Sequence, residues 1–351
     1  MQELDRRDVR YNFIDAGQHA ATTKDLIVQF KLRQPDVCLR QIRTNITTIP
    51  QAIRWALQTL GQLAFRKNEV WKQVFRGEPG ICLIHGDTLT TLISLLYAKR
   101  CGLKVAHVEA GLRSHHLLDP FPEEIIRLIA MRYSDLLFAP SDWAMDNLQN
   151  MGYADKAVAV GGNTGVDAVN YARRHVNSSS RPSEKYVVVT IHRVETIYSR
   201  SRMQVVASLL SRIAKERKIV FILHEPTRRQ LMRFSLYDTL SRNPSIKIRP
   251  LQPYLTFIEL LSGADFIVTD GGSIQEESYF LNVPCLIIRS KTERIEGLGE
   301  NALLGSFNQR SIDQFFETLP SLKSSPVEEN VCPSSVIVDH VVSWTYSTHE
   351  R

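Results

Sequence analysis

The chain has 351 residues, of which 43% are hydrophobic and 23% are charged, and its formal net charge is +6. This length exceeds what one hydrophobic core usually organises, so two domains are expected. The charge is modest, and no Lys/Arg tract is interleaved with aromatic residues, which argues against nucleic-acid binding and favours a small anionic ligand.

The cysteines and the hydropathy pattern exclude several other classes of protein. No two cysteines form a CxxC pair, so neither a zinc site nor a redox couple is predicted. The N-terminal segment MQELDRRDVR is charged, and no run approaches the roughly 20 apolar residues of a membrane span. We therefore expect a cytoplasmic protein that does not enter a membrane and holds no metal.

Short apolar runs alternate with longer amphipathic segments from the N-terminus onward, a pattern typical of βαβ units. In the first half, a helix is expected after each strand, and the helix after His85 is expected to begin near Asp87. A polar stretch then interrupts the alternation, which predicts a domain of residues 1–176 and a linker at 177–185. The strands expected here are 11–15, 81–85, 103–108, 135–138 and 157–160.

The second half repeats the alternation, so residues 186–351 are expected to form a second domain. Helices are predicted to begin near residues 200, 228, 254 and 273. The tail from residue 324 holds one weak helical segment, 336–344, which is expected to pack on the surface or to fray. The fold class is therefore α/β, with two doubly wound Rossmann-like domains facing a cleft. The expected strands are 186–192, 218–224, 245–250, 265–270 and 284–289.

Acidic residues follow predicted strands at three places in the first domain: Asp87 in IHGDT, Glu109 in HVEAGLR and Glu123 in PFPEE. In an open parallel sheet, ligands bind at this edge. Three carboxyl groups around one carbon would make a proton-transfer site. The structural alternatives are N-capping for Asp87 and solvation for Glu123.

Glu109 is harder to explain by a structural role alone. It ends an apolar strand, where an ionised carboxylate is costly unless it is partnered or used in chemistry. Arg113 or His107 is the partner that the sequence suggests.

In the second domain, the segment TDGGSIQEE runs from a strand through Gly271 and Gly272 into a helix. A glycine-rich turn at a helix N-terminus suits an anion, because it exposes backbone N–H groups and a partial positive charge. Ser273 and Glu276 have the spacing of a capping box. The alternative is a tight turn without a ligand. Glu277 is placed to accept hydrogen bonds from ribose hydroxyls. Arg294 follows the next strand, within reach of a phosphate.

Histidines also gather at strand ends of the second domain. His192 and Arg193 end its first strand and His224 ends its second. The recurrence at matching positions favours a functional role over a structural one. His115 and His116 are adjacent and cannot share one face, so they are expected in a loop and not as metal ligands.

These segments, taken in order, resemble a known family. HGDT, HVEAGLRS, PFPEE, GNTGVDA, the IHR strand end, TDGGSIQEE and TERIEG are similar in sequence and spacing to the non-hydrolysing UDP-N-acetylglucosamine 2-epimerases, from about Tyr11 to beyond Gly305. The resemblance implies the glycosyltransferase-B architecture, with the nucleotide held mainly by the C-terminal domain. It also implies a homodimer that needs no cofactor.

The resemblance further implies a reaction. UDP-N-acetylglucosamine (UDP-GlcNAc) would be inverted at C2 to UDP-N-acetylmannosamine (UDP-ManNAc), by elimination of UDP and its re-addition to a 2-acetamidoglucal, for the supply of surface-polysaccharide precursors. Two proton carriers on opposite faces of C2 would explain the inversion. Which carboxyl serves which face stays open.

Matched position by position, the family's functional residues fall on named residues of this chain. The catalytic acids fall on Asp87, Glu109 and Glu123, and the diphosphate-contacting histidine falls on His192. The substrate-binding positions fall on Gly271, Gly272, Ser273, Glu277 and Arg294. A second UDP-GlcNAc, bound as an allosteric activator in some members, would meet Gln18, His19, Arg193 and His224.

Three departures from the family pattern bear on these expectations. The family usually begins with a strand and a GTRPE-like loop, whereas this chain begins at what resembles the second strand, so the N-terminal domain is expected to lack its first strand. The common string TDSGGIQEE appears here as TDGGSIQEE. HRRE and TERPE appear as HRVE and TERIE, variants that point to a different UDP-sugar.

Three alternatives stay open. A glycosyltransferase on the same fold would transfer the sugar to an acceptor and would hardly need three acids around C2. A hydrolysing epimerase would release free N-acetylmannosamine, although HGDT and HVEAGLR argue against it. The third is an inactive UDP-sugar-binding relic truncated at its N-terminus.

Overall fold

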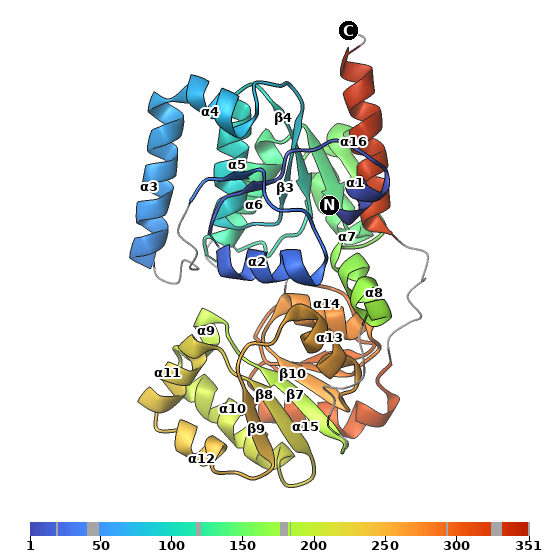
Figure 1. Ribbon diagram of the computed structural model, residues 1–351. Helices are drawn as coiled ribbons and strands as arrows, with labels where there is room; N and C mark the ends of the chain where they lie inside the picture. The colour runs from blue at the N-terminus through green and yellow to red at the C-terminus, as the bar shows by residue number, and fades with distance from the viewer. Residues whose placement is uncertain are drawn as a thin grey trace. The chain divides into compact units, whose positions relative to one another are not determined.

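The computed structural model describes residues 1–18, 20–40, 49–116, 121–175, 182, 184–292, 294–323 and 332–349. The chain divides into two compact units (Figure 1). Unit 1 comprises Met1–Thr164 with Asn330–Arg351, and unit 2 comprises Gly165–Glu329. Each is built on a parallel sheet with helices between most consecutive strands, so the expected α/β class with two Rossmann-like domains is confirmed. No helix in the described ranges is long and apolar enough to cross a membrane.

Unit 1 contains a four-stranded sheet of order β3-β4-β5-β6 and a separate parallel pair, β1-β2. β3 is an end strand of its sheet, and Leu83 within it keeps 39% of its surface exposed. The elements are α1 (Gln2–Arg6), β1 (Ile14–Asp15), α2 (Ala20–Gln29), β2 (Val37–Cys38), α3 (Ile49–Phe65), α4 (Lys67–Val74), β3 (Ile81–His85), α5 (Leu89–Arg100), β4 (Lys104–Val108), α6 (Glu123–Tyr133), β5 (Leu136–Ala139), α7 (Asp142–Asn150), η1 (Ala154–Lys156), β6 (Ala157–Ala159) and α16 (Pro333–His349).

Unit 2 contains a six-stranded parallel sheet of order β12-β11-β10-β7-β8-β9. The order reverses direction at β7, as a doubly wound sheet requires. The elements are α8 (Gly165–His175), β7 (Tyr186–Thr190), α9 (Val194–Ile197), α10 (Arg200–Ile213), β8 (Lys218–Ile222), α11 (Glu225–Arg233), α12 (Tyr237–Ser241), β9 (Ile246–Arg249), α13 (Tyr254–Ser262), β10 (Phe266–Thr269), α14 (Gly272–Phe280), β11 (Cys285–Ile287), β12 (Ala302–Leu304), α15 (Gln309–Thr318) and η3 (Leu319–Ser321).

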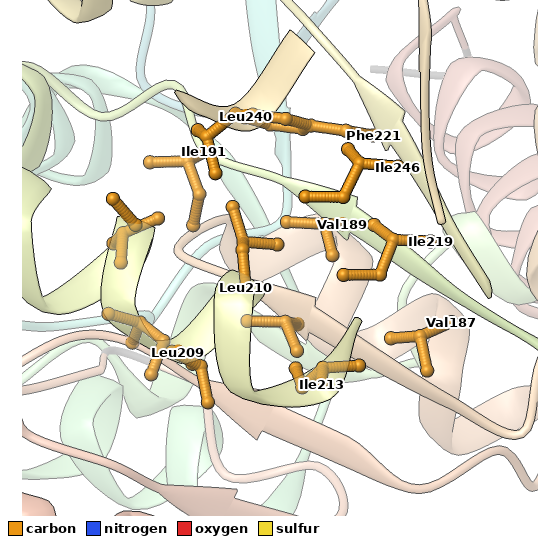
Figure 2. Close-up of a cluster of buried hydrophobic side chains, with 14 of the residues drawn as sticks. Val187, Val189, Ile191, Leu209, Leu210, Ile213, Ile219, Phe221, Leu240 and Ile246 are labelled. Atoms are coloured by element: carbon orange, nitrogen blue, oxygen red, sulfur yellow. The ribbon is translucent and has the colours of Figure 1, made fainter. Parts of the chain in front are cut away.

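The central strand β7 explains why unit 2 has a core on both faces of its sheet. Successive side chains of a strand point to opposite faces, so Val187 and Val189 enter one core while Tyr186 and Val188 enter the other. All five residues of β7 are buried, which is why the strand appears in the sequence as an unbroken apolar run. Figure 2 shows the first core, where β7, β8 and β9 meet α10 and α12 through Val187, Val189, Ile191, Leu209, Leu210, Ile213, Ile219, Phe221, Leu240 and Ile246.

The compact units differ from the expected domains in two segments. Helix α8, expected in the first domain, belongs to unit 2, because its Val169 and Ala172 pack with Ile258 of α13. The C-terminal segment, expected in the second domain, belongs to unit 1. Most of the expected linker at 177–185 lies outside the described residues.

The C-terminal helix α16 is also better packed than expected. Ile337 and Val341, one helical turn apart, are buried against Phe138 of β5. Near its N-terminal end, Arg7 pairs with Asp339, beside helix α1 (Figure 1). Of the two expected outcomes, the segment therefore packs on unit 1, and its apolar residues complete a core that the sequence alone does not reveal.

Candidate active site

The acidic edge of unit 1 is formed where β3 and β4 end side by side. His85 pairs with Val108 in the parallel ladder, so Asp87 and Glu109 leave the sheet at the same edge. Glu109 has a positive φ of 70°, which is uncommon for a residue with a side chain and typical of functional sites. A side chain at Gly86 would come within 3.3 Å of Glu109 Oε2, so glycine leaves room for the carboxylate.

The Glu109 carboxylate has partners that the sequence did not suggest. Asn163 Nδ2 donates to Oε1 across 2.8 Å, and His85 Nε2 lies 3.4 Å from Oε2. Among the described residues, neither expected partner is hydrogen-bonded to Glu109, although the charge of Glu109 acts on His107. His107 bonds the carbonyl oxygen of Gly86 at 2.8 Å, and its burial lowers its pKa to about 4, so it is neutral at pH 7.

Arg113, the other expected partner of Glu109, belongs to a buried chain of alternating charges. Its Nε donates to Glu124 across 2.5 Å, Glu124 lies 3.5 Å from Arg127, and Arg127 lies 2.5 Å from Asp87. Burial alone would raise the pKa of Glu124, but bonds from Arg113 and Ser114 and the charges of both arginines bring it below its ordinary value.

The structure excludes the N-capping role considered for Asp87. Thr88, not Asp87, is the N-cap of α5, which begins two residues later than expected. The Asp87 carboxylate instead contacts Arg127, which lies one helical turn after Glu123 on α6. Asp87 therefore lies against the helix that begins at Glu123.

Glu123 is not simply a solvated surface residue. It is half-buried, and its Oε2 is buried with no hydrogen-bond partner among the residues that the structure describes. A buried carboxylate oxygen in this state can accept a hydrogen bond from a ligand. The three predicted acids thus gather at one edge of unit 1, through the adjacent strand ends and the first turns of α6.

The carboxyl edge of unit 2 brings together residues from three adjacent strands. His192 follows β7, His224 follows β8 and Asp270 follows β10. The two imidazoles stack with ring centres 4.9 Å apart and an interplanar angle of 19°. Burial lowers the pKa of His192, against the charge of Asp270, and lowers the pKa of His224 to about 4.

The predicted allosteric residues fall in different surroundings. His224 stacks on His192, so it belongs to the same cluster as the predicted diphosphate contact. Arg193 is the N-cap residue of α9 and donates its backbone N–H to Asp270. Gln18 accepts the backbone N–H of Thr90 in the first turn of α5, in unit 1. His19 lies outside the described residues.

The glycine turn after β10 opens helix α14 as predicted, but the capping box is wrong. The helix begins at Gly272, with Gly271 as its N-cap and no side-chain cap. Ser273 therefore lies inside the first turn, where its side chain is exposed, and Glu276 pairs with Arg294 across 2.7 Å. The early helix start, which the two glycines permit, moves Ser273 out of the capping position.

Glu277 lies one turn into α14 and is half-buried. Burial raises its pKa to about 8, partly offset by a hydrogen bond from Tyr254. Its Oε2 is buried and has no hydrogen-bond partner in the described part of the chain. The Arg294 loop is held against the same helix, because Gln275 donates to the carbonyl oxygens of Arg294 and Glu296.

Sequence reasoning missed four residues that organise these two edges: Asn163, Arg127, Asp270 and Tyr254. Arg127 offered one signal, since it lies four residues after Glu123 in a predicted helix. Asn163 lies within the GNTGVDA segment, and Asp270 lies in TDGGSIQEE, between a strand and the glycines, where its carboxylate faces the neighbouring strand end.

Comparison with known proteins agrees with this geometry. The sequence model of the UDP-N-acetylglucosamine 2-epimerase family matches residues 2–330. A UDP-N-acetylglucosamine 2-epimerase of Methanocaldococcus jannaschii is 31% identical over 325 residues, covering 89% of this chain and 85% of that protein. The UDP-2,3-diacetamido-2,3-dideoxy-D-glucuronate 2-epimerase of Pseudomonas aeruginosa is 32% identical over 258 residues, covering 71% and 70%.

A solved structure extends the similarity to the fold. The crystal structure of the M. jannaschii UDP-GlcNAc 2-epimerase in complex with UDP-GlcNAc and UDP superposes with a TM-score of 0.82 at 28% identity, covering 97% of this chain and 94% of that one. With the acids at one sheet edge, the glycine turn at another and a family match over nearly the whole chain, this protein belongs to the UDP-N-acetylglucosamine 2-epimerase family.

Proposed function

We propose that the chain inverts C2 of UDP-GlcNAc to give UDP-ManNAc, without hydrolysis. The observation that carries the proposal is the convergence of Asp87, Glu109 and Glu123 on one edge of unit 1. A glycosyltransferase has no need of three acids around C2. The family match and the M. jannaschii relatives support the same substrate.

The proposed reaction is a balanced elimination and re-addition. One carboxylate removes the C2 proton while the bond between C1 and the UDP oxygen breaks, and the electron pair forms a C1=C2 double bond. UDP then adds back to C1, and a second carboxyl group delivers a proton to the opposite face of C2. No oxidant or reductant is required. General acid and base catalysis contribute on the order of 10²–10⁴ each.

Unit 2 supplies the groups proposed to hold the nucleotide. The N-terminus of α14 at Gly271 and Gly272 suits a diphosphate, because a helix N-terminus carries free N–H groups and a partial positive charge. His192 and Arg294 would contact the diphosphate, with Ser273 beside them. The buried Oε2 of Glu277 would accept a hydrogen bond from a ribose hydroxyl. The leaving UDP is thus held while the acids act on the sugar.

A second substrate is favoured by one observation. The P. aeruginosa relative acts on a UDP-diacetamido-glucuronate and is as similar to this chain as several UDP-GlcNAc epimerases are. The variants HRVE and TERIE also depart from the common family strings. A preference for that substrate over UDP-GlcNAc would keep the reaction and change the sugar.

We further propose a cytoplasmic homodimer, which size-exclusion chromatography with light scattering would test.

The test is proton NMR of UDP-GlcNAc incubated with the purified chain in D₂O. Deuterium at C2 together with the signals of UDP-ManNAc is the expected result. An acceptor product would identify a glycosyltransferase, and free N-acetylmannosamine a hydrolysing enzyme. A protein that binds UDP tightly but exchanges no C2 proton in either UDP-sugar would contradict the proposed function.

A further inference from the structure

Asp270 is a fully buried carboxylate behind the predicted diphosphate contact, His192. The register that pairs Thr269 with Thr190 places it beside the end of β7. Its Oδ1 accepts the backbone N–H of His192 and its Oδ2 accepts that of Arg193, each across 3.0 Å. Both oxygens are thus engaged with the two residues that leave β7.

The imidazole of His192 is confined from three sides. Its Nδ1 is buried, has no hydrogen-bond partner among the described residues and lies 3.5 Å from Asp270 Oδ1, which makes the contact electrostatic. The ring of His224 stacks on one face. A side chain at Gly271 would come within 2.8 Å of Cε1 of His192, so the ring occupies space that only glycine leaves. With Nδ1 facing inward, Nε2 is the nitrogen available to a ligand.

We propose that Asp270 is a positioning residue, which holds the His192 imidazole with Nδ1 inward and Nε2 toward the diphosphate, and which balances the positive charge that the ring acquires when the diphosphate binds. This inference rests on the proposed function, because only there does His192 contact a diphosphate. The arrangement resembles other buried carboxylates that orient a histidine and stabilise its imidazolium.

The charges around His192 set the direction of the expected effect. Burial lowers its pKa, Asp270 and Glu195 raise it, and Arg193 and Arg289 lower it. The neighbouring His224 adds a like charge whenever both rings are protonated. The free protein therefore holds His192 largely neutral at pH 7, and a bound diphosphate, with Asp270 behind the ring, favours the imidazolium. UDP binding is then coupled to proton uptake at His192.

The experiment compares the wild type with Asp270→Asn by NMR titration of histidines labelled with ¹³C and ¹⁵N, with and without UDP. We expect Asp270→Asn to lower the pKa of His192 by about one unit, the usual effect of losing an opposite charge at this distance. UDP affinity at pH 7 should fall roughly tenfold, the equivalent of one pKa unit. In the wild-type UDP complex, both ring nitrogens of His192 should carry protons.

Thr227→Val is the matched control. Thr227 is buried and its Oγ1 donates to the carbonyl oxygen of Ile191 across 2.6 Å, so this variant removes a side-chain bond to the same turn without changing a charge. It should lower stability and leave the His192 titration unchanged. An equal shift in both variants would show that Asp270 acts only on the backbone, and it would overturn the proposal.

Two further outcomes separate this inference from the proposed function. If Asp270→Asn fails to fold, the wild-type UDP complex decides, because an unprotonated Nδ1 there would overturn the proposal and a protonated one would support it. The titration of the UDP-free protein requires no turnover. A protein with the expected titration but no C2 exchange would contradict the epimerase activity and leave the positioning of His192 by Asp270 intact.

Discussion

Asn163 donates its side-chain amide to Oε1 of Glu109 across 2.8 Å, at the point where β4 ends and Glu109 adopts a positive φ. The bond orients one of the three proposed catalytic carboxyl groups. It joins residues 54 positions apart, within unit 1.

Asn163→Leu should lower kcat by about 10–100-fold, because a misdirected carboxyl group forfeits part of the 10²–10⁴ that acid or base catalysis supplies. The measurement is C2 deuterium exchange in D₂O. Asn147→Leu is the control, since Asn147 is a buried amide that bonds the carbonyl oxygen of Gly111. It should lose stability and keep kcat. Equal kcat values for the two variants would contradict an orienting role for Asn163.

Asp87→Asn, Glu109→Gln and Glu123→Gln should each abolish epimerisation and leave UDP binding largely intact. The proposed UDP-holding residues belong to unit 2, whereas the acids belong to unit 1. Each variant should therefore lose deuterium exchange at C2 and keep its UDP affinity, which calorimetry measures. Wild-type turnover in all three variants would show that the acids are wrongly assigned.

Glu277 predicts that nucleoside binding strengthens as the pH rises. Burial raises its pKa to about 8, so the free protein holds a neutral carboxylic acid at pH 7. A ribose diol that donates two hydrogen bonds favours the carboxylate, so binding should release a proton. Affinity should rise between pH 7 and pH 9. Uridine is the better probe than UDP, because it carries no titrating phosphate.

Two variants test whether Glu277 causes the pH dependence of uridine binding. Glu277→Gln should bind uridine more weakly and without the rise above pH 7. Tyr254→Phe removes the hydrogen bond that lowers the Glu277 pKa, so the rise should move to higher pH. Calorimetry in buffers of different ionisation enthalpy measures the released proton directly. A flat profile for the wild type would exclude Glu277 as the group that titrates on binding.

The ion network around Glu124 predicts that the folding stability of unit 1 falls in acid. Its folded pKa lies below the ordinary value of 4.5, so its contribution to stability is complete above that value and is lost as the pH falls through the folded pKa. Glu124→Gln breaks a buried ion network and should cost about 3 kcal/mol at pH 7. As the pH falls through the folded pKa and the wild-type carboxyl group becomes neutral, the difference should shrink.

Tryptophan fluorescence isolates the unit in question, because all four tryptophans, Trp55, Trp71, Trp143 and Trp344, belong to unit 1. Urea unfolding followed by this signal reports the stability of the unit that holds Glu124. Glu69→Gln, at an exposed ion pair with Arg66, is the control and should change stability by less than about 1 kcal/mol. A pH-independent difference between wild type and Glu124→Gln would contradict the role of the network.

The strands were largely predictable, and so was the position of Asp87 and Glu109 after strand ends. The strand expected at 81–85 coincides with β3, and others are trimmed by one to three residues, because buried parallel strands appear as short apolar runs. The two-residue β2 and the three-residue β12 were missed. Asp87 and Glu109 were found because polar residues soon after such strands stand out, whereas Glu123 begins helix α6.

The partners of these acids were not predictable from local sequence. Arg113 was expected beside Glu109, yet it bonds Glu124, and Asn163 takes the place at Glu109. The pKa of the ribose-binding candidate Glu277 is lowered by a hydrogen bond from Tyr254, which lies on a different helix. Side-chain pairing depends on which elements pack together, and this cannot be predicted from residue spacing along one element.

By itself, the sequence determined the α/β class, the alternation of elements and the residues that we propose to move a proton or hold a phosphate. It did so because periodicity and strand-end chemistry are local properties of the chain. Only the tertiary structure decided that α16 completes the core of unit 1, that His224 stacks on His192 and that Asp270 lies behind that ring. These contacts join residues far apart in sequence. Packing on β5 selects the first, and the adjacency of β10, β7 and β8 in the sheet selects the other two.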